Sequence, residues 1–228
     1  MQQGLAKIEK TRWKIRQSSL LRGCDAMFRL YFINTETAGE HLTWNFLHED
    51  EIQEALAFSS RLRRNRLIAV RGLLRKILTE WLGVSAEDIR FCRSENGKMF
   101  LAFPKVPVFF SVSHSRSDSI IAVSDRNIGI DMELIRDIDY LPIAEYCFSP
   151  AERKLCENSD DFLRLWTRRE ALVKLYGESL LSYMNIDVAG AADGTSLFLR
   201  THKVKGYVVS VAIERCEFSR EAIYDNRR

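Results

Sequence analysis

Two carboxylates in the second half of the sequence have a spacing that could do chemistry. Asp131 and Glu133 are two positions apart in the run Asn127–Leu134, where Ile128, Ile130 and Met132 alternate with other residues as in a β-strand. Both carboxylates would therefore leave the same face of the strand, about 6–7 Å apart. Two carboxylates this close repel each other unless a cation lies between them, and Mg²⁺ is typically held by one or two carboxylates, water and phosphate oxygens. A half-exposed strand with its polar face in water explains the alternation more simply.

A second pair of charged residues lies about forty positions further on. Glu170 and Lys174 are four positions apart in a segment of helical spacing, and they fall together at one edge of its apolar stripe. A helix edge in this position is where the helix meets its neighbouring element. The simpler interpretation is a surface Glu–Lys pair, which stabilises a helix by about 0.3–0.5 kcal/mol.

A histidine between two hydroxyl residues is the third candidate. His114 follows an alternating run and is flanked by Ser113 and Ser115, with the polar turn 116–118 after it. The hydroxyls could help to hold a phosphate, whereas a lone histidine at a strand end is more often a hydrogen-bonded surface residue.

Basic residues gather on the helical segment that ends near residue 82. Guanidinium groups bind phosphates through two hydrogen bonds, so this helix could hold a nucleotide or RNA. A solvated helix face accounts for most of the set. Its members are Arg61, Arg63, Arg64, Arg66, Arg71, Arg75 and Lys76.

The order of the elements that would position these residues occurs twice. A strand at 26–33 precedes a helical segment at 48–82, and a strand at 127–134 precedes a helical region that opens at Ser149-Pro150. Short strands follow each helix, so we expect an α+β fold of two similar halves, each a small antiparallel sheet packed with a long helix. The predicted units are a basic extension at 1–25 and halves at 26–125 and 126–228. The short strands are expected at 89–92, 99–103, 108–113, 119–124, 196–200 and 207–213.

Composition excludes several classes of protein. The chain has 228 residues, 46% of them hydrophobic and 29% charged, which is typical of a globular protein. No apolar run approaches the roughly 18 residues that a membrane span needs. Five cysteines without C-x-x-C spacing argue against a disulfide framework and a zinc site, and predict a cytoplasmic protein. The net charge is +3, but residues 1–25 alone carry +4, which leaves the remainder at −1.

Taken in order, these motifs resemble the 4′-phosphopantetheinyl transferases, in particular the longer, surfactin-synthetase-activating type with two pseudo-twofold halves in one chain. The resemblance extends from about residue 26 to residue 213. It is carried by Gly97-Lys98, Ser113-His114-Ser115, Ile128-Gly129-Ile130-Asp131-Met132-Glu133, Phe148-x-x-x-Glu152 and Trp166-x-x-Arg169-Glu170-Ala171-x-x-Lys174-x-x-Gly177.

The resemblance implies an enzyme that moves phosphopantetheine from coenzyme A to a serine of a carrier protein and releases adenosine 3′,5′-bisphosphate. It implies Mg²⁺ held by Asp131, Glu133 and Glu170. The expected catalytic residues are Glu170 as the base, Lys174 at the phosphate under attack, and His114. The residues expected to bind coenzyme A are Arg61, Arg66, Gly97, Lys98, Ser113, His114 and Lys174.

The resemblance also implies the partner. The expected substrate is a carrier protein or carrier domain of a fatty-acid, polyketide or nonribosomal-peptide synthase. A monomer is expected, and neither a membrane nor nucleic acid is an expected partner. Glu152 matches a glutamate of the family, and a helix-capping role explains it equally well.

Several positions depart from the family pattern. Arg169 stands where a lysine is usual, Met99 replaces a proline, and Glu178-Ser179 follows Gly177 where a second glycine is common. The basic residues that the family has ahead of the arginine helix have no match. This stretch is acidic instead, with Glu49, Asp50, Glu51 and Glu54.

Two other functions are compatible with parts of the pattern. The same carboxylates and the arginine helix could serve a Mg²⁺-dependent nuclease or nucleotidyl transferase. A non-enzymatic RNA-binding protein could use the basic extension and the helix. Neither alternative requires Ser-His-Ser together with Gly-Lys, so these two motifs favour the transferase.

Overall fold

The structure is a computed structural model that describes residues 13–14, 26–35, 44–179, 187–189 and 197–215. The predicted extension at 1–25 lies outside these residues, apart from Trp13 and Lys14. None of the helices in the described ranges is long and apolar enough to cross a membrane.

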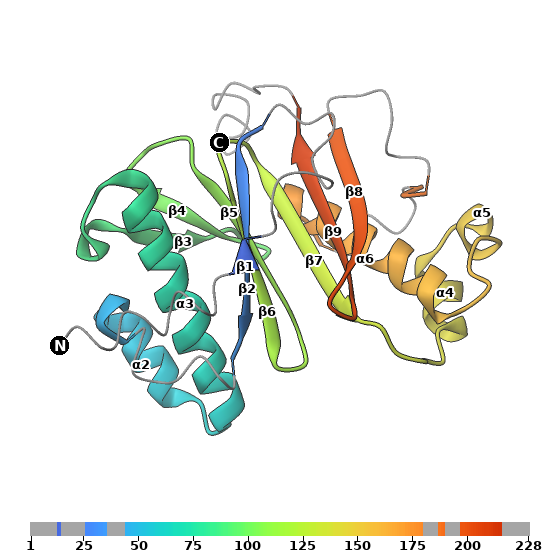
Figure 1. Ribbon diagram of the computed structural model, residues 1–228, viewed down its shortest axis with the longest axis horizontal. Helices are drawn as coiled ribbons and strands as arrows, with labels where there is room; N and C mark the ends of the chain where they lie inside the picture. The colour runs from blue at the N-terminus through green and yellow to red at the C-terminus, as the bar shows by residue number, and fades with distance from the viewer. Residues whose placement is uncertain (1–12, 15–25, 36–43, 180–186, 190–196, 216–228) are drawn as a thin grey trace.

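The α+β architecture predicted from the sequence is confirmed, with a sheet and a long helix in each half (Figure 1). The first sheet has the antiparallel order β1-β2-β6-β5, and the second has the antiparallel order β7-β9-β8. A hairpin, β3-β4, stands apart from both sheets. The strands are β1 (Trp13–Lys14), β2 (Phe28–Asn34), β3 (Arg90–Arg93), β4 (Met99–Phe103), β5 (Phe109–Ser115), β6 (Asp118–Ser124), β7 (Ile128–Leu134), β8 (Leu197–Val204) and β9 (Tyr207–Glu214).

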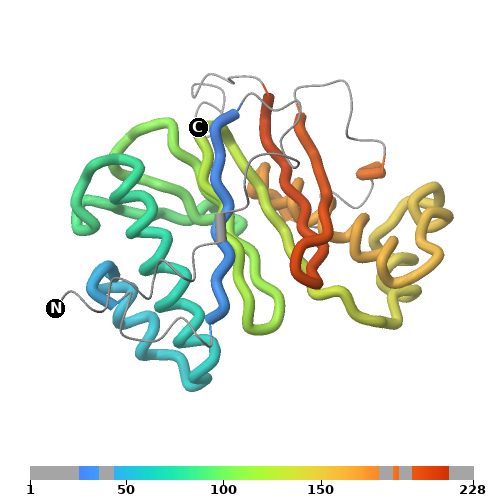
Figure 2. The backbone as a smooth tube through the Cα atoms, viewed as in Figure 1, coloured from blue at the N-terminus to red at the C-terminus, as the bar shows by residue number. Residues whose placement is uncertain are grey.

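Helices α3 and α6 pack against the two sheets on opposite sides of the molecule, with α2 beside α3 and with α4 and α5 beyond α6 (Figures 1 and 2). Short 3-10 turns cover Trp44–Phe46 and Ala86–Asp88. The helices are α2 (Glu49–Ala57), α3 (Arg61–Leu82), α4 (Leu141–Cys147), α5 (Pro150–Arg153) and α6 (Ser159–Tyr176).

The helical segment expected at 48–82 is divided into α2 and α3. Phe58 has extended backbone angles, and the Ser60 side chain accepts a hydrogen bond from the Arg63 amide, which begins a new helix. Both long helices end at a glycine with left-handed backbone angles, Gly83 after α3 and Gly177 after α6. The sequence predicted the end of this helical segment at residue 82, where α3 ends, but neither the break before Ser60 nor α4.

The hydrophobic core has three layers because side chains alternate along the strands. Leu30 of β2 and Met132 of β7 belong to a layer between the two sheets, where the inner faces meet. Tyr31, next to Leu30, faces α3, and Val208 of β9 faces α6. The order is therefore helix, sheet, sheet, helix, and it places the edge strands β5 and β7 side by side at the centre of the molecule (Figure 1).

Serine hydroxyls join these two edge strands. Ser111, Ser113 and Ser115 of β5 accept hydrogen bonds from the amides of Ile130, Met132 and Leu134 of β7, at 3.1, 3.2 and 3.1 Å respectively. We call these three residues the serine ladder. Since an unpaired buried amide costs about 1–3 kcal/mol, the ladder fixes the position of one sheet against the other.

Candidate functional site

Gly129 brings α6 close enough to β7 to form the site. A side chain at this position would place its Cβ 1.9 Å from the carbonyl oxygen of Ala171 and 2.4 Å from the amide nitrogen of Leu175. Both are backbone atoms of α6, so only glycine permits this approach. The contact joins the strand that carries Asp131 to the helix turns that carry Glu170 and Lys174.

Asp131, Ser113 and Lys174 form a buried hydrogen-bonded junction. The Asp131 Oδ1 atom accepts from the Lys174 ammonium at 2.6 Å and from the Ser113 hydroxyl at 2.7 Å. The same hydroxyl accepts from Lys174 Nζ at 3.0 Å. The other oxygen of Asp131, Oδ2, is buried and has no hydrogen-bond partner in the described part of the chain. Burial raises the pKa of Asp131, although Lys174 and Ser113 counteract this effect.

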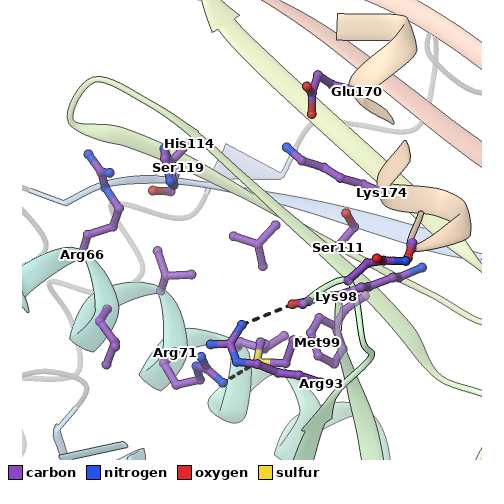
Figure 3. Close-up of a pocket in the computed structure, with 18 of the residues that line it drawn as sticks. Arg66, Arg71, Arg93, Lys98, Met99, Ser111, His114, Ser119, Glu170 and Lys174 are labelled. Atoms are coloured by element: carbon purple, nitrogen blue, oxygen red, sulfur yellow. Dashed lines mark hydrogen bonds between the residues drawn. The ribbon is translucent and has the colours of Figure 1, made fainter. Parts of the chain in front are cut away.

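The two remaining carboxylates of the predicted metal site, Glu133 and Glu170, both interact electrostatically with Asp131. Glu170 faces the cleft beside Lys174 (Figure 3). Burial raises the pKa of Glu170, and the charges of Asp131 and Glu133 raise it further, while Lys174 lowers it. Glu133 accepts from the Ser115 hydroxyl at 2.8 Å and from Arg136 at 3.2 Å.

The three carboxylates interact electrostatically but do not surround a common point. Among the described residues, no three His, Cys, Asp or Glu side chains are close enough together to hold a metal ion. The Lys174 ammonium lies against Asp131 instead. The donor set nevertheless fits Mg²⁺, because it consists of carboxylate oxygens that repel one another and includes the Oδ2 atom of Asp131, which has no hydrogen-bond partner among the described residues.

A cleft of about 790 Å³ opens in front of this junction. Its walls are α3, the β3-β4 hairpin, β5 and the last turns of α6 (Figure 3). Six arginine or lysine residues line it against three glutamates, so it suits an anionic ligand. The basic residues are Arg63, Arg66, Arg71, Arg93, Lys98 and Lys174, and the acidic ones are Glu54, Glu170 and Glu178.

His114 and Arg66, which the resemblance implies as residues that bind coenzyme A, lie together on the wall of the cleft (Figure 3). His114 lies at the end of β5, as its position after the alternating run indicated. Burial and the positive charges of Arg66 and Lys174 lower the pKa of His114, which favours the neutral imidazole. Arg66 donates to the Arg116 carbonyl oxygen, which directs its guanidinium toward the β5-β6 turn.

Two residues predicted to bind coenzyme A are placed differently. Arg61, the first residue of α3, is exposed and is not among the residues that line the cleft. Ser113 is buried and contacts Asp131 and Lys174 rather than the cleft surface.

The Gly97-Lys98 pair lies in the cleft, but its lysine is directed at α6. Lys98 Nζ donates to the Leu175 carbonyl oxygen at 2.6 Å and to Asn127 Oδ1 at 3.0 Å. Asn96 donates to the Gly177 carbonyl oxygen at 3.1 Å. Burial lowers the pKa of Lys98 to about 8. The turn of the β3-β4 hairpin thus holds the C-terminal end of α6 and closes one side of the cleft.

Other charged residues of the sequence motifs have structural roles. Arg169 is fully buried and donates to Glu152 at 2.6 Å, and Glu152 also forms the capping box with Ser149. Arg75 is buried as well, and its Nε donates to Glu51 at 2.6 Å. The capping role of Glu152 was predicted, whereas the two buried ion pairs were not.

The placement of the arginines argues against the RNA-binding alternative. Arg75 binds Glu51 and two backbone carbonyls inside the protein, and Arg64 donates to the Phe58 carbonyl oxygen. Arg71 is 3.5 Å from Glu51. Five of the seven basic residues of this helix are thus turned toward α2 or the cleft, which leaves few of them for a polynucleotide.

Comparison with known proteins identifies the family. A family model described as the 4′-phosphopantetheinyl transferase superfamily matches residues 127–212. The transferase HetI from a Nostoc species is 34% identical over 63% of this chain and 65% of its own length. The transferase gsp from Aneurinibacillus migulanus is 30% identical over 70% of both chains. This chain belongs to the 4′-phosphopantetheinyl transferase superfamily.

A third member of the superfamily, the transferase ffp from Bacillus subtilis, is 28% identical over 76% of this chain and 85% of its own. The chain thus spans just under two thirds of HetI and more of the other two relatives. Residues 127–212, which match the superfamily model, contain Asp131, Glu133, Glu170 and Lys174. The resemblance stated from the sequence motifs is therefore confirmed at the level of the superfamily.

Proposed function

We propose that this protein transfers the 4′-phosphopantetheine group of coenzyme A to a serine of a carrier protein and releases adenosine 3′,5′-bisphosphate. The observation that carries the proposal is the junction of Asp131, Ser113 and Lys174 beside Glu170, at the wall of a basic cleft. Membership of the superfamily supports it. A carboxylate, an ammonium group and a carboxylate of raised pKa are the groups that a phosphoryl transfer needs to hold and deprotonate its reactants.

In this proposal Asp131, Glu133 and Glu170 would hold Mg²⁺ against the pyrophosphate of coenzyme A. When bound, the ion would neutralise charge on the phosphate oxygens. The raised pKa values of Asp131 and Glu170 support this assignment, because carboxylates that are costly to ionise without a cation are suited to bind one.

Glu170 takes the proton of the attacking serine, directly or through water. Lys174 lies at 2.6 Å from Asp131 and can turn to the phosphate, where it offsets the charge that develops during transfer. His114, neutral at physiological pH, donates a hydrogen bond to a phosphate oxygen next to Arg66. Binding of coenzyme A by Arg61, Ser113 and the hairpin pair Gly97-Lys98 stays a prediction.

We further propose a cytoplasmic monomer built from the extension 1–25 and the halves 26–125 and 126–228. The free thiols of Cys92, Cys147 and Cys156 support a reducing compartment. The proposed partner is the carrier protein or carrier domain of a fatty-acid, polyketide or nonribosomal-peptide synthase, with nucleic acid excluded from the cleft.

The test is mass spectrometry of a purified carrier protein after incubation with this protein, coenzyme A and Mg²⁺. The proposal predicts a mass gain of one phosphopantetheine per carrier, which requires both coenzyme A and Mg²⁺. A carrier variant whose acceptor serine is replaced by alanine is the control. The proposal is wrong if carriers of all three kinds stay unmodified while a known transferase modifies them in parallel.

A further inference from the structure

Two hydroxyls of the serine ladder have a second partner besides the amide of β7. Ser113 donates to Asp131 Oδ1 at 2.7 Å. Ser115 repeats this arrangement and donates to Glu133 Oε2 at 2.8 Å. Each of these hydroxyls also accepts from the amide of the residue that follows the carboxylate. Two carboxylates that are expected to bind Mg²⁺ are thus held by hydroxyls of the other sheet, across the contact of β5 with β7 (Figure 1).

Each of the two carboxylates has one oxygen that is held and one that is open. The donors to Asp131 all bond Oδ1, and Oδ2 has no hydrogen-bond partner among the described residues. At Glu133 the bond from Ser115 and the bond from Arg136, which is 3.2 Å long, both go to Oε2. Neither of them uses Oε1. The bonds therefore restrict the orientation of each carboxylate and leave its second oxygen for a cation.

Of the two donors to Glu133, Ser115 is the one that is fixed in place. Ser115 is buried, and its hydroxyl accepts from the Leu134 amide at 3.1 Å. The Arg136 side chain is 35% exposed, and exposed ion pairs of this kind are weak. Ser115 is not among the residues that line the cleft, so its hydroxyl serves the protein rather than the donor.

We propose that Ser115 is a positioning residue of the metal site: its hydroxyl holds Glu133 by Oε2 and leaves Oε1 to bind the ion. The inference rests on the proposed function, because it concerns the Mg²⁺ site of that reaction. The loss of a residue that orients a metal ligand typically weakens metal binding about 10- to 100-fold. The lower end is expected here, since Arg136 still bonds Glu133 when Ser115 is replaced.

Ser111 provides a matched control within the same ladder. Its hydroxyl accepts from the Ile130 amide at 3.1 Å, as the hydroxyl of Ser115 accepts from the Leu134 amide. The residue before Ile130 is Gly129, which has no side chain, so Ser111 has no carboxylate to hold at this position of β7. Ser111→Ala therefore loses the same kind of amide contact as Ser115→Ala and leaves the metal ligands in place.

The measurement is the Kd of Mn²⁺, an ion that suits the same carboxylate oxygens as Mg²⁺ and that electron paramagnetic resonance detects when it is free. The titration contains coenzyme A and no carrier protein, so that no turnover occurs. It compares the wild-type protein with Ser115→Ala and Ser111→Ala, and the melting temperature of each is recorded without metal. A second pair, Glu133→Ala with and without Ser115→Ala, shows whether the serine acts through the glutamate.

Ser115→Ala should raise the Kd of Mn²⁺ about tenfold, whereas Ser111→Ala should keep it within about twofold. Both variants should lower the melting temperature by similar amounts, because each leaves one amide of β7 without its acceptor. When Glu133 is already alanine, Ser115→Ala should change the Kd by less than about twofold, since the side chain that it orients is absent.

Three results overturn the inference. They are a rise in Kd of less than about threefold in Ser115→Ala, an equal rise in Ser111→Ala, and an effect of Ser115→Ala that persists in full without Glu133. The second and third would mean that the serine acts on the contact between the sheets and not on the metal ligand.

Carrier modification, measured in parallel, separates this inference from the proposed function. If the wild-type protein binds Mn²⁺ and the variants show the expected ratios while no carrier is modified, the proposed function fails and Ser115 still positions a metal ligand. If the wild-type protein with coenzyme A binds Mn²⁺ no more tightly than coenzyme A alone does, the metal site of the proposed function fails and the inference is wrong with it.

Discussion

The replacement Gly129→Ala should separate the geometry of the site from the stability of the fold. The new Cβ would lie 1.9 Å from the Ala171 carbonyl oxygen, whereas an ordinary contact is about 3.5 Å. Helix α6 must therefore move away from β7 by about 1.5 Å, because neither backbone atom can yield alone. The movement would open the 2.6 Å contact between Lys174 Nζ and Asp131 Oδ1 to about 4 Å.

A displacement of this size predicts a loss of about 100-fold in the rate of carrier modification. Overpacking should also lower the free energy of unfolding by about 1–3 kcal/mol. The rate is measured by mass spectrometry of the carrier, and the stability by urea unfolding.

Gly83→Ala is the control for Gly129→Ala, because it loses stability without a collision near the site. Gly83 has a φ of 67°, and no atom of the described residues lies within 4 Å of a Cβ added there. This variant should lose about 1–2 kcal/mol from backbone strain and keep its rate. If Gly129→Ala loses the same stability as Gly83→Ala and works at the wild-type rate, the close contact of α6 with β7 does not position the site.

Three further replacements test the contacts around the cleft. Ser113→Ala and Ser111→Ala each leave one β7 amide without its acceptor, so both should lower the free energy of unfolding by about 1–3 kcal/mol. Only Ser113→Ala should also raise the Mg²⁺ concentration needed for half-maximal rate, since Ser113 holds Asp131; an equal shift in both variants would refute this. Lys98→Met tests the buried ammonium: the pKa of Lys98 is about 8 in the folded protein against an ordinary lysine value of 10.5, so between these pH values the unfolded chain binds more protons. The wild-type free energy of unfolding should therefore rise relative to that of Lys98→Met as the pH increases from 8 to 10, and a constant difference in urea unfolding would contradict the burial of this charge.

Local patterns in the sequence were sufficient for most of the elements. Alternation predicted β7 with Asp131 and Glu133 on one face, and helical spacing predicted α6 with Glu170 and Lys174 at one edge. These elements carry the site because glycine at 129 allows them to touch, which no periodicity reveals. From the sequence, only the resemblance of the motifs to the family indicated that the two segments form one site.

Contacts between distant segments were the part that the sequence could not predict. From the sequence, Arg75 is one of several basic residues on a solvated helix face. In the structure Glu51 lies beside it and both are buried. From the sequence, Ser113 was expected to bind a phosphate. In the structure it is buried against β7. In each case the partner belongs to another element of the fold. The tertiary structure therefore decides which polar and charged side chains stabilise the protein instead of binding a ligand.

Asp131→Asn tests the central claim most directly, that Asp131 anchors a magnesium-dependent transfer in this cleft. The variant keeps the size of the side chain and the hydrogen bond with Ser113, and it removes the charge next to the unpartnered Oδ2 atom. The measurement is the rate at which phosphopantetheine appears on a carrier protein across a Mg²⁺ titration, with the melting temperature recorded in the absence of metal. We predict a melting temperature close to or above that of the wild type, because burial already disfavours the ionised Asp131, and a rate lower by orders of magnitude at every Mg²⁺ concentration. A variant that modifies the carrier at the wild-type rate with the wild-type Mg²⁺ dependence would contradict the claim.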